Sequence, residues 1–408
     1  MPNKTSPIWT AVTVLLVCLS QAVATAQQLP ANANSKSNPA IVLFLSGDVM
    51  LGRAIDQILP YHNDPVLYED YVKDAREYIW LAEDANGPIP KPVSCDYIWG
   101  DALEQLDKVN PDARIINLET SITQNDAPWK NKYIHYRMHP KNAACLVSAK
   151  IDVALLANNH VLDWGYRGLA ETLFTLEQTG LKTAGSGINL KAATRPAIID
   201  IKHKGRVIVS AWAHASSGTP REWAATGNRA GVNRLDNLGA VAVQHIGNSI
   251  NSVKQPGDIA VVSIHWGGNW GYDIPSEHVE FAHRLIDEAH VDVVHGHSSH
   301  HAKGIEVYKG KLIIYGSGDL LNDYEGISRY EKYRADLSLM YFASIDPATG
   351  NLVHLQMTPT QIRKLRINRA NNSDALWLRN MITREGRELG TRAELNADNN
   401  LVLDWAKD

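Results

Sequence analysis

The sequence predicts an α/β protein with a mixed β-sheet, and two patterns carry this prediction. From residue 40 onward, short apolar runs of strand length alternate with longer stretches of helical periodicity, which is typical of α/β folds. Two pairs of apolar runs, 197–201 with 207–211 and 304–308 with 312–315, flank tight turns that contain Lys and Gly. Such turns join antiparallel neighbours, so we expect the sheet to combine parallel and antiparallel strands.

The expected strands are short apolar runs bounded by polar or glycine-containing turns. They cover residues 41–45, 114–117, 152–156, 197–201, 207–211, 259–264, 291–295, 304–308 and 312–315. The expected helices show apolar residues at helical spacing and cover residues 99–109, 142–150, 168–179, 235–253 and 276–289. A further hairpin at 337–345 and 352–357, a helix near 375–389 and a strand pair around 393–405 form a C-terminal extension.

The N-terminus has the pattern of an export signal. The apolar stretch 8–23 follows a single basic residue, Lys4, and ends in the small-x-small cleavage pattern Ala24-Thr25-Ala26. We therefore expect a signal peptide at 1–26, a flexible tether at 27–39, one domain at 40–330 and the extension at 331–408. The expected location is periplasmic or extracellular, and an uncleaved N-terminal membrane anchor is the alternative.

Composition and cysteine usage exclude several classes of protein. The 40 Lys and Arg residues against 44 Asp and Glu give a net charge of -4, which argues against a nucleic-acid-binding protein. Beyond the signal, Cys95 and Cys145 remain, and in an oxidising compartment they could pair or both stay as free thiols. The absence of a CxxC pair excludes an all-cysteine zinc site. Two polar insertions, 61–92 and 213–233, are long enough to form walls of a site.

Polar residues capable of binding metals follow five of the predicted strands. In α/β sheets the site gathers at the carboxyl ends of the strands. The five ends carry Asp48; Asn117 and Glu119; Asn158, Asn159 and His160; His265 and Trp266; and His295, His297, His300 and His301. Each end alone has an ordinary explanation, such as a cap or a core histidine. Five together indicate a single site.

The residue types in this set predict the chemistry. A mixture of Asp, Glu, Asn and His suits Zn, Mn or Fe better than Ca. Two such ions could activate water and stabilise a tetrahedral oxyanion, with His160 held by Asp163 as the proton donor. Arg53 would suit an anionic substrate, or it is a surface residue. The segment 47–52 matches neither a phosphate-binding loop nor a dinucleotide fingerprint, and the chain has no GxSxG elbow.

Taken together, these motifs resemble the CapA family of capsule-synthesis proteins, which is associated with poly-gamma-glutamate. The resemblance rests on GDVMLGR at 47–53, NLE at 117–119, ANNHVLDWG at 157–165, HWG at 265–267 and GHSSH at 296–300. It runs from about residue 42 to 323, roughly two thirds of the chain. The family is similar to the calcineurin-like metallophosphoesterases, which implies an α-β-β-α sandwich with mixed sheets. Met50 departs from that pattern, because it stands where metallophosphoesterases usually have a metal-binding His.

The resemblance also implies roles for individual residues. The implied metal ligands are Asp48, Glu119, Asn159, His265, His297 and His300; the implied catalytic residues are His160 and Asp163; and the implied substrate contacts are Arg53, Asn117, Asn158, Trp266 and Asp319. One or two divalent transition metals, Zn, Mn or Fe, would be the cofactor.

The expected function is that of an exported, metal-dependent, hydrolase-like protein in capsule or poly-gamma-glutamate-type polymer synthesis. Its expected partners are an anionic extracellular polymer and a membrane polymer synthase, and not nucleic acid. Two alternatives stay open at this point. One is a metallophosphoesterase that acts on a phosphate ester, and the other is a non-catalytic accessory protein that holds the polymer.

Overall fold

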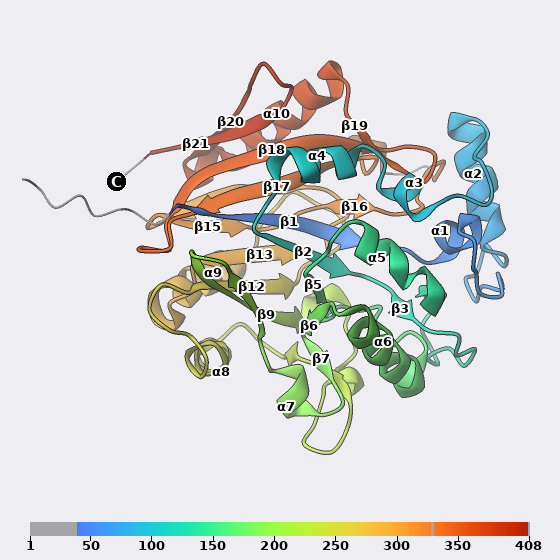
Figure 1. Cartoon of the computed structure of the whole chain (residues 1–408), viewed down its shortest axis with the longest axis horizontal. Helices are drawn as coiled ribbons and strands as arrows, with labels where there is room; N and C mark the ends of the chain where they lie inside the picture. The colour runs from blue at the N-terminus through green and yellow to red at the C-terminus, as the bar shows by residue number, and fades with distance from the viewer. Residues whose placement is uncertain (1–38, 328–329, 407–408) are drawn as a thin grey trace, which may run out of the picture. The chain divides into compact units, whose positions relative to one another are not determined.

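The computed structural model describes residues 39–327 and 330–406. In this part, the chain forms two large mixed β-sheets, two small two-stranded sheets and the helices around them (Figure 1). The predicted α/β class with mixed sheets is therefore confirmed. The expected signal peptide and all but the last residue of the expected tether lie outside the described residues. Among the described helices, none has the length and apolar character needed to cross a membrane.

The first large sheet has ten strands in the order β20-β21-β18-β17-β1-β2-β5-β6, with β16 beside β1 and β19 beside β18. Their bounds are β1 Ile41–Val49, β2 Ala113–Leu118, β5 Val153–Leu155, β6 Lys182–Ala184, β16 Asp319–Leu321, β17 Leu337–Ile345, β18 Leu352–Ile362, β19 Ile367–Arg369, β20 Thr391–Leu395 and β21 Leu401–Trp405. Strand β1 is parallel to β2 and β16 but antiparallel to β17. The predicted hairpin at 337–357 is thus confirmed, and it continues the sheet directly beside β1.

The second large sheet has seven strands in the order β11-β9-β12-β13-β15-β14, with β8 beside β9. Their bounds are β8 Ala197–Ile201, β9 Gly205–His214, β11 Arg234–Leu235, β12 Ile259–His265, β13 Val293–His297, β14 Ile305–Tyr308 and β15 Lys311–Ile314. The predicted hairpins β8–β9 and β14–β15 are antiparallel, as expected. The small sheets pair β3 (Ser121–Ile122) with β4 (Arg137–Met138) and β7 (Ser186–Gly187) with β10 (Gly231–Val232).

The helices include all those that the apolar spacing predicted. The α-helices are α1 Arg53–Ile58, α2 Arg76–Asn86, α3 Cys95–Trp99, α4 Asp101–Val109, α5 Ala144–Ser148, α6 Gly165–Thr179, α7 Leu190–Ala193, α8 Ala240–Asn251, α9 Ser276–Ala289 and α10 Asn372–Gly386. Short 3-10 turns are η1 Pro140–Ala143, η2 Ala215–Ser217, η3 Arg221–Trp223, η4 Glu331–Tyr333 and η5 Arg387–Leu389. Four α-helices, α1, α2, α3 and α7, were not predicted, because α2 lies in a polar insertion and the others are too short for a periodic signal.

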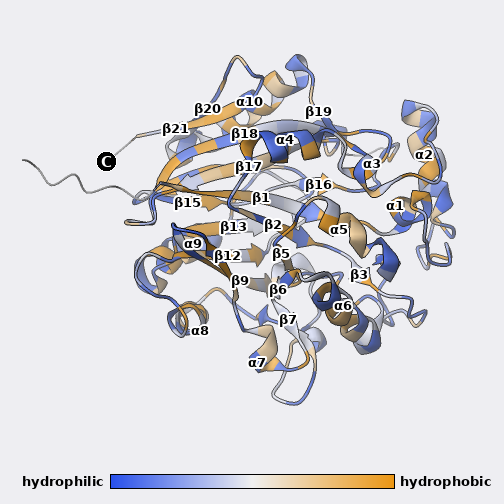
Figure 2. Cartoon of the chain, in the orientation of Figure 1, coloured by the Kyte–Doolittle hydropathy of each residue, from blue (hydrophilic) through white to orange (hydrophobic). Residues whose placement is uncertain are grey.

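The two faces of the second sheet pack against different partners. On β12, Val261 belongs to the core shared with the first sheet, whereas Val262 and Ile264 pack with α8 and α9. Figure 2 shows hydrophilic and hydrophobic residues side by side on α9, whose buried residues include Phe281 and Leu285. Because side chains alternate along a strand, residues that lie an even number of positions after Val261 face the first sheet. The last residue of β12, His265, is one of them.

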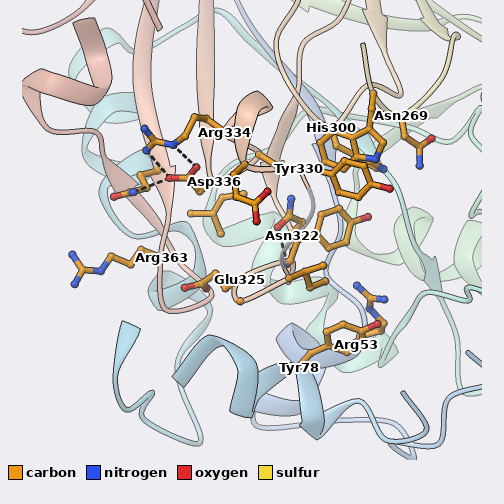
Figure 3. Close-up of a pocket in the computed structure, with 18 of the residues that line it drawn as sticks. Arg53, Tyr78, Asn269, His300, Asn322, Glu325, Tyr330, Arg334, Asp336 and Arg363 are labelled. Carbon is orange, nitrogen blue, oxygen red and sulfur yellow. Dashed lines mark hydrogen bonds and ion pairs between the residues drawn. The ribbon is translucent and has the colours of Figure 1, made fainter. Parts of the chain in front are cut away.

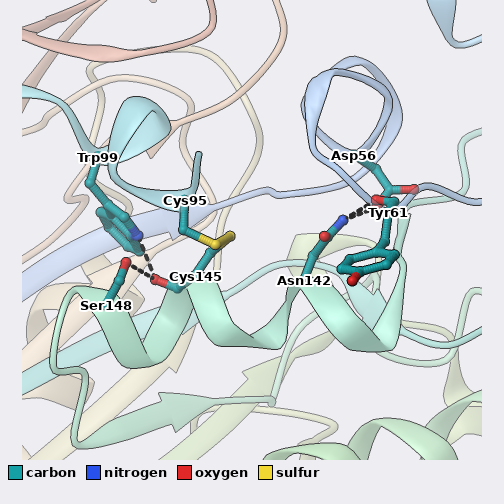
Figure 4. Close-up of a disulfide and its surroundings, with 7 residues drawn as sticks. All are labelled: Asp56, Tyr61, Cys95, Trp99, Asn142, Cys145 and Ser148. Atoms are coloured by element: carbon teal, nitrogen blue, oxygen red, sulfur yellow. Dashed lines mark hydrogen bonds between the residues drawn. A yellow bond between two sulfur atoms is a disulfide. The ribbon is translucent and has the colours of Figure 1, made fainter. Parts of the chain in front are cut away.

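A disulfide joins the two cysteines of the described chain. Cys95 in α3 is bonded to Cys145 in α5, across a sequence separation of 50 residues (Figure 4). The carbonyl oxygen of Cys145 accepts hydrogen bonds from the Trp99 indole at 2.7 Å and from the Ser148 hydroxyl at 3.1 Å. Of the two possibilities left open by the sequence, the structure contains the paired form.

Replacing both Cys95 and Cys145 by Ala is expected to lower the free energy of unfolding by about 2–4 kcal/mol, because the crosslink restricts a long loop in the unfolded chain. Urea unfolding of the variant and the wild type, with and without reductant, measures this difference. Reductant should lower the free energy of unfolding of the wild type alone and so remove the difference. Equal stability of the two proteins under oxidising conditions would contradict the expectation.

Buried Asp56 holds α1 to two neighbouring segments. Its carboxylate accepts hydrogen bonds from the backbone nitrogens of Asn63 and His139, both at 2.8 Å, and from the Asn142 amide at 3.0 Å (Figure 4). Burial nevertheless raises the pKa of Asp56 from 3.8 to about 6, although these hydrogen bonds oppose the rise. Desolvation of the charged form therefore outweighs the donated hydrogen bonds.

The raised pKa of Asp56 predicts a specific pH dependence of stability. Its stabilising contribution is fully present below pH 3.8 and is lost as the pH rises through about 6, because the folded state then has to bury the charge. The loss amounts to about 3 kcal/mol. Urea unfolding at pH 4 and pH 7.5 should therefore show a smaller pH-dependent loss in Asp56→Asn than in the wild type. Identical pH dependences would contradict this assignment.

Candidate metal and substrate site

Asp48 lies at the carboxyl end of β1, where a bulge interrupts the pairing with β2. The bulge requires glycine at position 47, since a Cβ there would lie 1.6 Å from the carbonyl oxygen of Gly318. Asp48 itself donates its backbone N–H to that same oxygen at 3.0 Å. Its Oδ1 accepts a hydrogen bond from the Asn117 amide at 2.6 Å, whereas its Oδ2 is buried and has no hydrogen-bond partner. Asp48 therefore has one oxygen that is held in place and one that is open to a cation.

Two histidines of the second sheet face Asp48. His265 and His297 end the parallel strands β12 and β13 and are directly paired in register, so both rings point to the same side. Their Nδ1 atoms lie 2.8 Å apart. Nδ1 of His265 lies 3.9 Å from Oδ1 of Asp48, and Nδ1 of His297 lies 3.5 Å from the same oxygen. The Asn159 Oδ1 approaches Nε2 of His265 at 3.2 Å. These four side chains converge from both sheets on one point.

A second group of ligand atoms shares Asp48. Glu119 follows β2 and His300 follows β13, and each offers an atom to a cluster with Asp48 whose members lie within 4.8 Å of one another. The triad of Asp48, His265 and His297 meets the same criterion. Nδ1 of His300 lies 3.0 Å from Oδ1 of Asp319, and a carboxylate in this position orients a metal-binding imidazole. Asp48 is thus the residue common to two candidate metal positions.

The electrostatics of the cluster fit a bound cation. Burial, together with Asp319, raises the pKa of Asp48, and burial together with Asp48 raises the pKa of Glu119 well above its ordinary value. Burial lowers the pKa values of His265 and His297, so both rings are neutral. Neutral imidazoles are metal ligands, and a divalent ion supplies the positive charge that the carboxylates lack. With the unpartnered Oδ2 of Asp48, the donor set fits one or two Zn, Mn or Fe ions.

His160 and Asp163 form a hydrogen-bonded pair beside this cluster. Nδ1 of His160 lies 2.7 Å from Oδ2 of Asp163, which also accepts the backbone N–H of Tyr136 at 2.7 Å. Lys132, which the sequence analysis did not identify, lies 2.5 Å from the other Asp163 oxygen and 3.1 Å from Nδ1 of His160. Burial lowers the pKa of His160, and Lys132 lowers it further. The ring is therefore neutral, and both the Asp163 carboxylate and the Lys132 ammonium face its Nδ1.

Arg53 and the other residues expected to bind substrate are largely engaged with the protein. Arg53 donates to both carboxylate oxygens of Asp323 and, at 2.9 Å, to Glu69. Its side chain is only 2% exposed. Trp266 stacks on His278, with ring centroids 4.3 Å apart, and donates to the carbonyl of Tyr315 in the second core. The sequence offered no signal for these partners, because they lie in distant segments.

Asn117, Asn158 and Met50 are buried supports of the site. Asn158 donates to the Asn117 side chain at 3.2 Å and accepts the backbone N–H of His160 at 3.0 Å. Asn117 in turn donates to Asp48. The sulfur of Met50 accepts the backbone N–H of Gly52 at 3.1 Å. The two asparagines therefore link the loop that carries His160 to the central carboxylate.

A cavity of about 400 Å³ opens beside the cluster. His300, Tyr136 and Tyr324 line it, as do Trp270 and Tyr330, whose rings are stacked 4.0 Å apart (Figure 3). The lining also includes Tyr71, Tyr78 and Asn86 from the predicted wall 61–92, and Arg334, Asp336 and Arg363 from the C-terminal region. No described residue of the second predicted wall, 213–233, lines this cavity. A cavity of this volume lies within the range of small-molecule binding sites.

The chain is similar to a known family and to several known proteins. The family described as bacterial capsule synthesis protein PGA_cap matches residues 42–324. The chain is 47% identical over 368 residues to a probable polyglutamine synthesis accessory protein of Mycobacterium tuberculosis, which covers 90% of this chain and 97% of that protein. It is 26% identical to the PGA biosynthesis protein CapA of Bacillus subtilis, over 78% of this chain and 70% of that protein. It is 23% identical to the capsule biosynthesis protein CapA of Bacillus anthracis, over 79% and 70%.

Proposed function

This chain belongs to the PGA_cap family of bacterial capsule synthesis proteins, and from that premise we propose that it is an exported, metal-dependent hydrolase that acts on an anionic polymer during its synthesis or release. The observation that carries the proposal is the position of Asp48, which belongs both to the triad with His265 and His297 and to the triad with Glu119 and His300. A carboxylate between two ligand sets is the arrangement that two-metal hydrolases need.

The residues around this carboxylate supply the remaining steps of a hydrolysis. A bound divalent ion would activate water and polarise the scissile group. His160, held by Asp163, accepts a proton and returns it to the leaving group. Asn117 fixes the orientation of Asp48, and Asp319 fixes that of His300.

Export is supported by the disulfide between Cys95 and Cys145 and by the signal pattern at 1–26. Disulfides persist in oxidising compartments and are rare in the cytosol. Detection of the mature protein outside the cytoplasm, with an N-terminus near residue 27, tests this part of the proposal. An intact N-terminus in the membrane fraction would instead favour the uncleaved anchor.

The proposed activity is tested by metal analysis followed by a hydrolysis screen. Purified protein is loaded with Zn, Mn or Fe, and the bound metal is counted. Loaded and chelator-treated protein are then given gamma-linked glutamate oligomers and an aryl phosphate. Oligomer cleavage that requires metal and is lost in His160→Ala supports the proposal, with exposed His245→Ala as the matched control. Cleavage of the aryl phosphate alone would favour the phosphoesterase alternative.

A second candidate, a non-catalytic protein that holds the polymer, is favoured by the aromatic cavity of about 400 Å³. Trp270 and Tyr330 stack on each other, and aromatic rings of this kind could pack against a bound polymer without reacting with it. Oligomer binding that persists in metal-free protein and in His160→Ala, with no turnover by the wild type, would establish this function and exclude the hydrolase.

A further inference from the structure

Tyr136 and Tyr324 meet at the wall of the cavity although they lie far apart in the sequence. Tyr136 directly precedes β4 and Tyr324 follows β16, and their hydroxyl oxygens lie 2.8 Å apart. Both residues line the cavity, and Tyr136 is only 2% exposed. Neither residue was identified from the sequence, because a single tyrosine in a loop carries no functional pattern.

Each tyrosine ring contacts a histidine of the candidate site. Tyr136 stacks on His160, with ring centroids 3.9 Å apart and an interplanar angle of 22°. Tyr324 meets His300 edge-on, with centroids 5.2 Å apart and an angle of 90°. The tyrosine pair therefore spans the gap between the proton-accepting histidine and the second ligand triad. Tyr136, Tyr324 and His300 all line the cavity.

The hydrogen bond between the two tyrosines uses only one of their two hydroxyl protons. Each phenol has one proton, and the single hydrogen bond between the two hydroxyls uses one of them. Within the described residues, neither hydroxyl has another hydrogen-bond partner. Because both residues line the cavity, the remaining O–H is available to an acceptor atom of a ligand. Phenols are protonated at neutral pH, so both residues can act as donors.

The Arg53 cation close to Tyr136 is already paired with carboxylates. The Arg53 guanidinium lies 4.9 Å from the centre of the Tyr136 ring, but it is held by Asp323 and Glu69. A neutral O–H is then the group that this part of the wall offers to an incoming oxygen. Donors of this type stabilise negative oxygens strongly in a desolvated site.

We propose that the Tyr136–Tyr324 pair donates its free O–H to an anionic oxygen of the ligand beside the candidate metal cluster, as a specificity-determining contact. The inference rests on the proposed function, because it takes that cluster as the reactive centre. The ligand oxygen belongs to a carboxylate or to a phosphate group.

The test measures ligand binding separately from metal binding. Tyr136→Phe, Tyr324→Phe and the double variant are compared with the wild type, and Tyr133→Phe is the matched control, since Tyr133 is 68% exposed and does not line the cavity. Bound metal is counted first. Inorganic phosphate and a gamma-linked glutamate trimer are then titrated calorimetrically into metal-loaded and metal-free protein. Ultraviolet difference spectra near the tyrosine band report directly on the phenols.

The expected result is unchanged metal content and an affinity for one probe that falls about 10- to 100-fold in the Tyr136 and Tyr324 variants, but not in Tyr133→Phe. The probe affected identifies the oxygen as carboxylate or phosphate. If the wild type binds no metal but its anion binding still depends on the pair, the hydrolase proposal fails and the inference stands. Anion binding that is absent from the wild type, or unaffected by loss of both hydroxyls, would overturn the inference whatever the metal content.

Discussion

Asp48→Asn is expected to remove transition metal from both candidate ligand triads. Asp48 is the common member of the two triads, and its Oδ2 is buried without a partner. Loss of an outer-shell partner alone typically weakens metal binding about 10- to 100-fold, so loss of a shared charged ligand should weaken it by more. Elemental analysis and a titration with Mn or Zn measure the change.

Further variants test whether the loss of metal is specific to Asp48, the ligand that both triads share. His297→Ala and His300→Ala each remove a ligand from one triad, so each should retain metal at the other. Asp70→Asn makes the same chemical change at an exposed position and should bind metal like the wild type. In chelator-treated protein, Asp48→Asn should not destabilise the fold, because burial already disfavours the charged carboxylate. Full metal content in a folded Asp48→Asn variant would be incompatible with the site.

Arg53→Leu is expected to cause the largest loss of stability, about 3–5 kcal/mol in the free energy of unfolding. The substitution leaves the carboxylates of Asp323 and Glu69 buried without their counter-ion, since their side chains are at most 1% exposed. It also removes the guanidinium that lies 3.9 Å from the centre of the Tyr78 ring. Denaturant unfolding at neutral pH measures the effect.

Two further arginine variants show how much of the stability loss depends on the charge of Arg53 and how much on its burial. Arg53→Lys keeps the charge but not the planar two-pronged contact with Asp323, so its effect should be intermediate. Arg76→Leu breaks the exposed pair with Asp74, where the Arg76 side chain is 57% exposed, and should lower the stability far less than Arg53→Leu. Similar losses from Arg53→Leu and Arg76→Leu would show that the buried network contributes little.

The sequence was sufficient for features that depend on local periodicity. Apolar runs located β1, β12 and β13, and the position of His265 and His297 at strand ends predicted that they would converge. It was not sufficient for features that depend on which distant segments meet. The guanidinium of Arg53 is held by Asp323, and the Tyr136 hydroxyl meets that of Tyr324, through tertiary packing that no spacing in the chain encodes.

The same distinction applies to the short helices and to the supporting asparagines. The helix α1 contains only residues 53–58, too few for a hydrophobic period, and its position is set by Asp56 and its contacts. Asn117 lies near the end of β2 and Asn158 follows β5, yet Asn158 bonds to Asn117 and Asn117 bonds to Asp48. Residue type and position near a strand end thus predicted that both asparagines lie at the site. Only the structure shows which residues they bond to.

The position of β1 in its sheet affects how the protein folds. Strand β1, which carries Asp48, is flanked by β2 on one side and by β17 on the other, so Ile41 pairs with Ile345. Nearly the whole chain must therefore be available before this strand has both neighbours. Contacts between such distant segments form slowly and leave an open strand edge that is prone to aggregate. A chain truncated before residue 337 would lack β17 and would keep that edge of β1 exposed. The C-terminal strands are therefore needed to complete the sheet that carries Asp48.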